Sequence, residues 1–407
     1  MGGAAKQMMH PYDDLDMTFS QMSNLIMKIS LGDVNSIEKV DGLNIHWYLN
    51  ENHSPMFARN MTEIKSRGIS LNEIRTKMET HPGGAQFLAG INAIAERAKN
   101  IAWPGPKQGQ HWVNTEIVSS NHPQTIRYDF DALVYHDLVM MNLARNAMVS
   151  CSRPYSSYWN SFLRSEFNNP HSWKAFHKLE IKINPSPLDQ HVISAMVSIR
   201  NLMESYNLEY ESTLRDYYMR ITQAQCEEVG LSSIHAIQIS ENVWNSGKHK
   251  IQLIKKQLPK QTHSHLDRIG LSKYRQGYQG KCKTQMRRIW DIFGAKVIEP
   301  LDSCLIKNSA NARQRLDELV RFNIIQAGEI HINTHPHIWE ELQGNLDRFE
   351  SLNVECPVME GIVIPMYGKI YKLTGAFPSM NRICGAVRYP LGIDFEKEKE
   401  KTFANAY

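Results

Sequence analysis

The sequence predicts an α+β fold in which one β-rich domain is interrupted by a long helical segment. Residues 1–150 contain mainly short apolar or alternating runs, the pattern of strands. Apolar residues at helical spacing dominate 151–353, β character returns over 354–390, and a charged tail occupies 391–407. Because β-rich segments flank the helical one, we expect a single sheet-containing domain with an insertion instead of three domains in a row.

The first β-rich part begins with a candidate hairpin. Runs 36–40 and 43–49 flank Asp41 and Gly42, and Asp-Gly between apolar runs is the strongest short hairpin signal, since both residues tolerate positive φ. Apolar spacing predicts a helix over 84–99. Further strands are expected at 54–64, 111–118, 124–130 and 132–140.

The helical segment carries one clear start signal. Ser186 is a candidate N-cap with Pro187 at the first helical position. Further helices are expected at 244–258, 281–302 and 311–328. His331, His335 and His337 lie close together in the sequence, and we expect a loop there instead of a metal site. No Cys or acidic residue stands at zinc-motif spacing, and Pro336 prevents helical pairing of the histidines.

Composition limits the class of protein. Hydrophobic residues make up 42% and charged residues 22%, which is ordinary for a globular chain, and the net charge of +4 permits a nucleic-acid partner without requiring one. The six cysteines form no C-x-x-C pair, so we expect reduced thiols and no zinc site. The N-terminus lacks an apolar signal core, and no run reaches the roughly 18 apolar residues of a membrane span. These features predict a cytoplasmic protein without a membrane partner.

Several chemically active residues follow one another along the predicted strands. Each has an ordinary explanation alone: Lys39 as an exposed strand residue, Arg59 as a surface cation, Lys369 and Lys372 as edge-strand charges. Together they provide an amine nucleophile, cations for phosphates, carboxylates for a metal or a ribose, and an aromatic surface for a base. The full set in chain order is Lys39, Asp41, Gly42, Arg59, Glu116, Tyr135, His136, Asp137, Glu360, Lys369 and Lys372.

These pieces resemble the covalent nucleotidyltransferase superfamily of ATP-dependent RNA and DNA ligases and GTP-dependent mRNA capping enzymes. The resemblance is carried by Lys-Val-Asp-Gly at 39–42, Arg59, Thr-Glu-Ile-Val at 115–118, the strand ending at Asp137, Glu-Gly-Ile-Val at 360–363 and Tyr-Lys-Leu at 371–373. The matched pieces cover about a third of the chain. The resemblance implies an antiparallel-sheet, ATP-grasp-like ligase core with a large helical insertion and no OB-fold, because only 35 residues follow Lys372.

The resemblance also implies roles. Lys39 would form a lysyl-N-AMP intermediate with ATP, after its pKa falls through burial and neighbouring cations. Arg59, Lys369 and Lys372 would hold the triphosphate, and Glu116 would contact the sugar. Asp41 and Gly42 would shape the turn, and Tyr135 or His136 would face the base. Glu360 and Asp137 would bind Mg²⁺ or Mn²⁺. The partner would be RNA or DNA ends, and RNA is favoured because RNA ligases more often lack the OB-fold.

Two departures and two other function classes stay open. His136 stands where the family has an aromatic residue before the Asp, and Thr374 stands where a second lysine of the last motif is expected. A capping guanylyltransferase is one alternative, and a non-catalytic binding protein with a decayed ligase core is another. Two basic stretches, at 255–268 and 273–288, are candidates for binding a nucleic-acid backbone or for an ordinary solvated face, and the second contains interleaved tyrosines.

Overall fold

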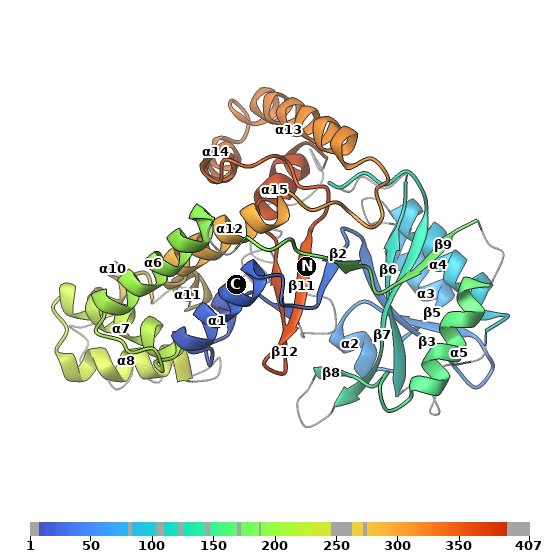
Figure 1. Ribbon diagram of the computed structural model, residues 1–407, viewed down its shortest axis with the longest axis horizontal. Coiled ribbons are helices and arrows are strands. Elements are labelled where there is room, and N and C mark those ends of the chain that lie inside the picture. The colour runs from blue at the N-terminus through green and yellow to red at the C-terminus, as the bar shows by residue number, and fades with distance from the viewer. Residues whose placement is uncertain are drawn as a thin grey trace.

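The computed structural model contains two β-sheets and three groups of helices (Figure 1). It describes residues 8–79, 84–101, 103, 110–120, 125–142, 147–168, 172–186, 189–245, 263–271 and 275–388. Nearly all strand pairs are antiparallel, so the mixed α/β class with antiparallel sheets is confirmed. No described helix has the length and apolar character that crossing a membrane requires.

The large sheet forms one end of the molecule (Figure 1). Its strand order is β5-β4-β3-β6-β7-β8, and β9 pairs with β7 in parallel. Apolar side chains on one face of its central strands pack against α3, α4 and α5. The bounds are β3 Leu43–Leu49, β4 Pro55–Ala58, β5 Ile69–Ser70, β6 His111–Val118, β7 Ala132–Asn142, β8 Ala147–Ser150, β9 Lys174–His177, α2 Met61–Lys65, α3 Leu71–Glu79, α4 Gly84–Ala98 and α5 Ser156–Phe167.

The small sheet lies in the middle of the molecule and combines segments from both ends of the chain. Its order is β1-β12-β11-β2-β10, so strands near the C-terminus are inserted between strands near the N-terminus. The pairs are antiparallel except β1 with β12. The bounds are β1 Met8–Met9, β2 Ser36–Lys39, β10 Glu180–Ile181, β11 Gly361–Met366 and β12 Lys369–Leu373, with a 3-10 turn, η1, at Pro11–Asp13.

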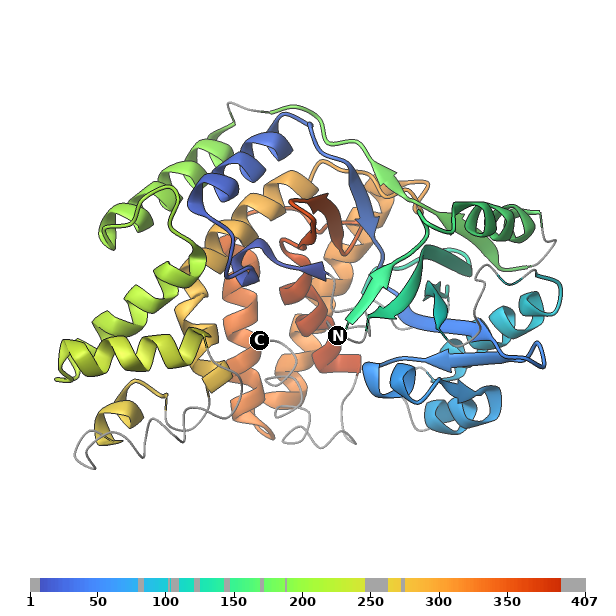
Figure 2. The ribbon, with the colours of Figure 1, turned by 90° about the horizontal axis from the view of Figure 1, so that it is seen from below.

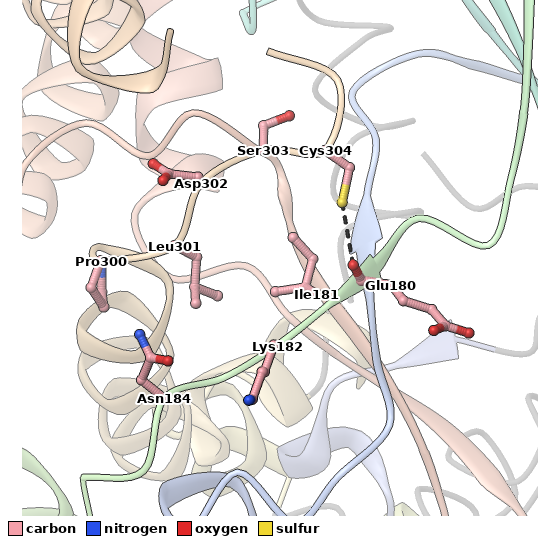
Figure 3. A pocket seen from close by; sticks show the side chains of 9 residues that line it. All are labelled: Glu180, Ile181, Lys182, Asn184, Pro300, Leu301, Asp302, Ser303 and Cys304. Carbon is pink, nitrogen blue, oxygen red and sulfur yellow. Dashed lines mark hydrogen bonds between the residues drawn. The ribbon is translucent and has the colours of Figure 1, made fainter. Parts of the chain in front are cut away.

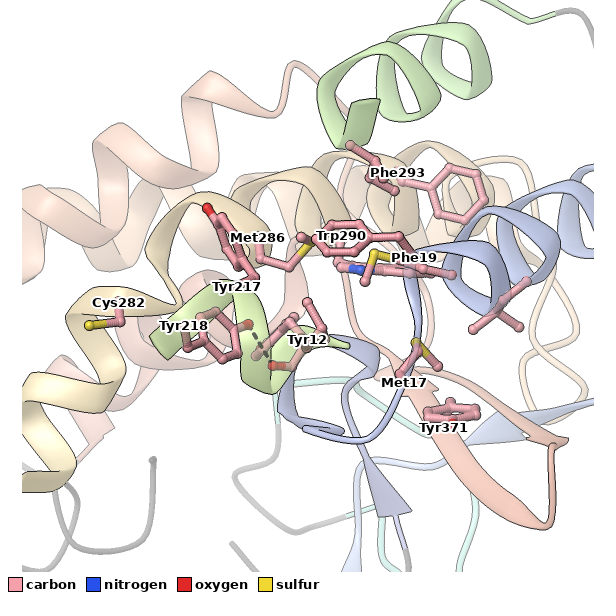
Figure 4. Close-up of a cluster of buried hydrophobic side chains, with 14 of the residues drawn as sticks. Tyr12, Met17, Phe19, Tyr217, Tyr218, Cys282, Met286, Trp290, Phe293 and Tyr371 are labelled. Atoms are coloured by element: carbon pink, nitrogen blue, oxygen red, sulfur yellow. Dashed lines mark hydrogen bonds between the residues drawn. The ribbon is translucent and has the colours of Figure 1, made fainter. Parts of the chain in front are cut away.

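A helical lobe packs on the face of the small sheet that carries Ile362, Tyr371 and Leu373 (Figure 4). Capping boxes fix the starts of two of its helices, at Thr18 with Gln21 and at Thr213 with Asp216. The lobe comprises α1 Phe19–Ser30, α6 Gln190–Ser205, α7 Leu214–Glu228, α8 Ser233–Asn245, α10 His263–Arg268, α11 Arg275–Cys282 and α12 Thr284–Ile298.

A second group of helices, α13 Ser309–His331, α14 Pro336–Ser351 and α15 Phe377–Arg388, lies where the two sheets meet (Figures 1 and 2). Phe377 and Met380 of α15 share a core with Val40, between the sheets, and Val134 of the large sheet. His331 ends α13 and is buried, with Nε2 bonded to the Ala386 carbonyl, and His335 precedes α14. No group of three or more His, Cys, Asp or Glu side chains that could hold a metal ion occurs among the described residues.

The predicted hairpin at 36–49 is wrong. β2 and β3 form near the predicted bounds, but they belong to different sheets: β2 pairs with β10 and β11, and β3 pairs with β4 and β6. Residues 40–42 therefore carry the chain from one sheet to the other. The hairpin signal failed because both strands find longer-range partners, which local turn chemistry cannot anticipate.

The insertion boundary also differs from the prediction. Residues 151–353 were expected to be mostly helical, yet β9 joins the large sheet and β10 joins the small one. The helical insertion thus begins after β10, near 182. The expected strand at 124–130 is irregular over its described part, 125–130. Asp189 is the N-cap of α6, α8 ends at Asn245, and the expected helix at 244–258 lies almost wholly outside the described residues.

Candidate functional site

Lys39 and Glu360 meet at the point where the chain leaves the small sheet. Lys39 is the last residue of β2, and it pairs with Gly361, the first residue of β11. This register brings Lys39 Nζ to 2.5 Å from Glu360 Oε2. The two side chains are only 17% and 19% exposed, so the ion pair lies in a recess and not on an open surface. Two residues that are 321 positions apart in the sequence are thus brought together as the motif order predicted.

Gly42 allows the large sheet to approach this ion pair. A Cβ atom at Gly42 would lie 2.7 Å from Glu116 Cγ and 2.7 Å from the Ile117 carbonyl oxygen, closer than real Cβ atoms come. Only glycine therefore fits the predicted position. Glu116 accepts a hydrogen bond from Asn44 Nδ2 at 3.2 Å and lies 3.3 Å from His136 Nε2. Glu116 thus stands over the first residues of the large sheet, next to Lys39.

Asp41 holds a loop in place. Its Oδ2 accepts hydrogen bonds from the backbone N–H groups of Thr125 and Ile126 at 2.9 and 3.0 Å, and its own N–H donates to Tyr128 Oη at 3.1 Å. The sequence did not single out Tyr128, which is buried beside the ion pair. Burial and then the charges of Glu38 and Asp41 raise the pKa of Tyr128 well above its ordinary value, so its hydroxyl keeps its proton.

The two predicted phosphate lysines face opposite sides of the small sheet. Lys372 pairs with Val363, which pairs with Ile37, two residues before Lys39. Side chains alternate along strands, so Lys372 and Lys39 share one face. Lys369 is three residues from Lys372 and points to the other face, where its Nζ lies 2.5 Å from Asp14 Oδ1. The structure therefore places Lys369 away from Lys39, in an ion pair that ties β12 to the N-terminal segment, and its predicted contact with phosphate stays a prediction.

A β-bulge changes which residues of β7 face the site. Asn114 pairs with Asp137 and Thr115 with Tyr135, which leaves His136 as an extra residue. Tyr135 and Leu138 both face the apolar core of the large sheet, and the Tyr135 hydroxyl bonds Glu166. Tyr135 is therefore not available to a base, whereas His136 reaches Glu116. Alternation along a strand places Tyr135 and His136 on opposite faces, and the sequence left open which of them faces the base.

Asp137 and Arg59 lie apart from the Lys39–Glu360 pair. Asp137 receives hydrogen bonds from Ser150 and Ser152, and burial still raises its pKa. It belongs to the β7–β8 edge, so a metal set of Glu360 with Asp137 is not formed. The Arg59 guanidinium lies against Met78 Sδ and over the Phe87 ring, on the helix-covered face of the large sheet. Neither predicted contact with the site is made in this structure.

His46 is a polar residue that the sequence reasoning missed. It is fully buried on the same face of the large sheet as Asn44 and Glu116, and neither ring nitrogen has a hydrogen-bond partner among the described residues. Burial, with the charge of His136 behind it, lowers the pKa of His46 to about 3. Its position inside a strand that is buried at every residue except Asn44 gave no signal, because a buried histidine in such a strand is commonly a core residue.

The electrostatics of the two lysines are opposite. Burial alone lowers the pKa of Lys39, but the charges of Glu360 and then Glu116 outweigh it, and the pKa is raised. Burial and then the charge of Lys39 lower the pKa of Lys372. The expectation of a lowered Lys39 pKa is therefore wrong for the protein without ligand. For Lys39 to lose its proton near neutral pH, Glu360 must bind another positive charge, such as a metal ion, in place of the lysine ammonium.

The Glu360→Gln substitution is expected to lower the pKa of Lys39, because it removes the largest favourable charge and leaves burial. A lower pKa means that a larger fraction of Lys39 is neutral at a given pH, so an amine-reactive acylating reagent modifies Lys39 faster at mildly alkaline pH. Mass spectrometry of the modified peptide across a pH series measures this. Lys369, paired with Asp14, is the internal control. An unchanged Lys39 profile would contradict the assigned cause.

The donor set suits a hard divalent cation bound mainly through phosphates. Glu360 and Glu116 offer carboxylate oxygens close enough to raise the Lys39 pKa, and Mg²⁺ or Mn²⁺ is typically held by one or two carboxylates plus phosphates and waters. The described residues do not form a cluster of three or more metal ligands, so they provide no cage for a cation on its own.

A separate pocket of about 280 Å³ lies beside β10 and residues 300–304 (Figure 3). Glu38 points to that side of β2, where Ser303 Oγ and the Cys304 N–H each donate to its carboxylate at 2.6 Å. Side-chain alternation places Lys39 on the other side of β2. The pocket therefore contains no residue of the predicted site.

Comparison with known proteins adds no family. No protein-family model, no curated protein and no solved structure matches this chain.

Proposed function

We propose that this protein is an ATP-dependent polynucleotide ligase, more specifically an RNA ligase, that acts through a lysyl-N-AMP intermediate. The observation that carries the proposal is the Lys39–Glu360 contact across β2 and β11, with Glu116 brought close by Gly42. A recessed amine beside two carboxylates and a second lysine, Lys372, is suited to binding a metal-associated phosphate and attacking it. The residues stand in the order that the ligase motifs have.

In the first step Lys39 Nζ attacks the α-phosphorus of ATP. The new N–P bond replaces the bond to pyrophosphate, which leaves, and the amine proton passes to solvent or to a neighbouring carboxylate. A divalent cation bound by Glu360 and the phosphates would neutralise developing negative charge. Lys372 contributes a second positive charge on the same face, and its repulsion of Lys39 favours the neutral amine once Glu360 is engaged.

In the later steps the AMP group moves from Lys39 to a polynucleotide end. A 5′-phosphate oxygen attacks the AMP phosphorus, the N–P bond breaks, and Lys39 regains a proton. A 3′-hydroxyl then attacks the activated 5′-phosphorus, forms the phosphodiester bond and releases AMP. His136 and Asn44, which contact Glu116, line the adjacent face of the large sheet, where the nucleoside would lie.

The test is covalent labelling. The full chain is incubated with Mg²⁺ and ATP that carries ³²P at the α position, and labelled protein is detected on a denaturing gel. We expect an acid-labile, alkali-stable label, as a phosphoramidate requires. A parallel reaction with labelled GTP separates a ligase from a guanylyltransferase, and nicked or single-stranded RNA and DNA then identify the ends joined. Absence of label with both nucleotides would overturn the proposal in favour of a non-catalytic protein.

A further inference from the structure

The N-terminal segment places a histidine beside Lys372. β1 runs parallel to β12, with Met8 opposite Ile370 and Met9 opposite Tyr371. The next residue, His10, is therefore level with Lys372 and on the same face of the small sheet as Lys39. His10 stacks on Tyr12, with ring centroids 4.8 Å apart and planes inclined by 7°. None of the motifs that define the proposed function includes this segment.

Helix α12 adds an arginine from the helical lobe. The Arg287 guanidinium carbon lies 5.6 Å from the centre of the Tyr12 ring, so Tyr12 contacts both His10 and Arg287. One turn further along α12, Asp291 pairs with Arg348 of α14. Asp13 pairs with Lys283 at 2.7 Å, so that carboxylate is engaged by another cation. The positive side chains around His10 thus come from the small sheet, α12 and α14.

Lys372 and the Thr374 hydroxyl have no hydrogen-bond partner in the part of the chain that the structure describes. Lys372 makes no ion pair or hydrogen bond with another described residue; burial and then Lys39 disfavour its charge, and the more weakly acting Glu360 and Asp13 favour it. Thr374 Oγ1 is buried without a partner among the described residues, and Thr374 is only 5% exposed. Between Lys39 and Thr374 stands Gly361, which has no side chain. A cation and a hydroxyl donor left in this way are suited to an anionic ligand.

We propose that His10 and Arg287, together with Lys372 and Thr374, form a phosphate-binding subsite beside Lys39. The ligand is a phosphate group with at least two negative charges, supplied either by the pyrophosphate end of the nucleotide or by the 5′-phosphate of a polynucleotide. The choice between these two sources rests on the proposed function, whereas anion binding itself does not. Through this subsite, the N-terminal segment and the helical lobe would each contribute a phosphate-binding side chain to the reaction at Lys39.

The charge state of His10 agrees with this assignment. Burial, and then Lys372, Arg287, Lys39 and Arg348, keep the pKa of His10 well below its ordinary value. A bound dianion would offset these cations and raise that pKa, so binding takes up a proton and becomes tighter as the pH falls toward it. Titration of the His10 ring protons by NMR, with and without pyrophosphate, measures the rise.

The decisive experiment is calorimetric titration with inorganic pyrophosphate in the presence of EDTA. We expect binding to the unmodified protein and a loss of affinity on the order of tenfold in Arg287→Gln and in His10→Gln, since each removes one charge-assisted contact. Arg287→Lys should recover part of the loss. Arg200→Gln removes an exposed arginine of α6, paired with Glu204, and should bind as the unmodified protein does.

A second arm identifies the source of the phosphate. A 5′-phosphorylated oligoribonucleotide is compared with its 5′-hydroxyl twin, using the same variants. Selective loss of pyrophosphate affinity assigns the nucleotide's leaving group, and selective loss of 5′-phosphate affinity assigns the polynucleotide end. Failure of both anions to bind, or equal binding by Arg287→Gln and Arg200→Gln, would overturn the subsite. Covalent labelling with no anion binding would reject the subsite alone, and anion binding without labelling would reject only the ligase.

Lys372→Met separates a binding role from a structural one. Because the ammonium is half-buried and has no ion-pair partner among the described residues, its removal is expected to raise the melting temperature. The same variant should lose pyrophosphate affinity. A lysine kept for structure would instead show a lower melting temperature, and unchanged pyrophosphate binding would also contradict the assignment.

Discussion

Lys39→Arg is expected to reduce covalent labelling by ATP at least about a thousandfold, while the protein stays folded. Arginine keeps the positive charge that pairs with Glu360, so the junction of β2 and β11 retains its ion pair. A guanidinium cannot lose its proton in the accessible pH range and cannot form the phosphoramidate. The same gel assay that detects the label measures the loss, and circular dichroism checks the fold.

Lys369→Arg is the matched control for this substitution. Lys369 is also a strand lysine in a 2.5 Å ion pair, but it faces Asp14 on the opposite side of the small sheet. Its replacement should leave labelling near the level of the unmodified protein. Equal labelling of the Lys39→Arg and unmodified proteins would show that another nucleophile carries the nucleotide, and Lys372 offers an amine on the same face.

The order of the motifs predicted part of this site because the motif residues lie at the ends of strands, and the apolar pattern of the sequence indicated those strands. Gly361 opposite Lys39 is the pairing that joins the motif at 39–42 to the motif at 360–363. β2 forms near its predicted bounds, and β11 lies within the segment 354–390 where β structure was expected. The lysines show the limit. Counting along 369–374 cannot tell which lysine faces Lys39 until the strand and its partners are known, because a shift of three residues changes the face.

Other parts of the site depend on contacts that no local pattern encodes. The bulge at His136 is a property of pairing between β6 and β7 and has no sequence signature here. His10 and Arg287 are 277 positions apart, and they meet only because β1 adds to β12 and α12 packs on η1. The reversed pKa of Lys39 likewise requires Glu360 and Glu116 to be placed in space. The sequence indicates which chemical groups are present, but the effect of one charge on the pKa of another depends on the fold.

Gly361→Ala is expected to destabilise the fold by roughly 3 kcal/mol, the range for a severe backbone or packing conflict. A Cβ atom at this position would lie 2.0 Å from the Leu373 carbonyl oxygen, and that atom belongs to the backbone of the adjacent strand. β11 and β12 must separate to admit the methyl group, which also displaces Glu360 from Lys39. Denaturant unfolding followed by tryptophan fluorescence measures the loss, and labelling should fall with it.

Gly344→Ala provides the comparison because it makes the same chemical change in an open environment. Gly344 lies inside α14 with no atom within 4 Å of the added Cβ, and alanine favours a helix over glycine by about 1 kcal/mol. This variant should unfold at an equal or higher denaturant concentration than the unmodified protein. If Gly361→Ala also unfolded without loss of stability, the close approach of β11 to β12 would be wrong. The pairing of Lys39 with Gly361 would then also be wrong, and so would the position of Glu360 beside Lys39.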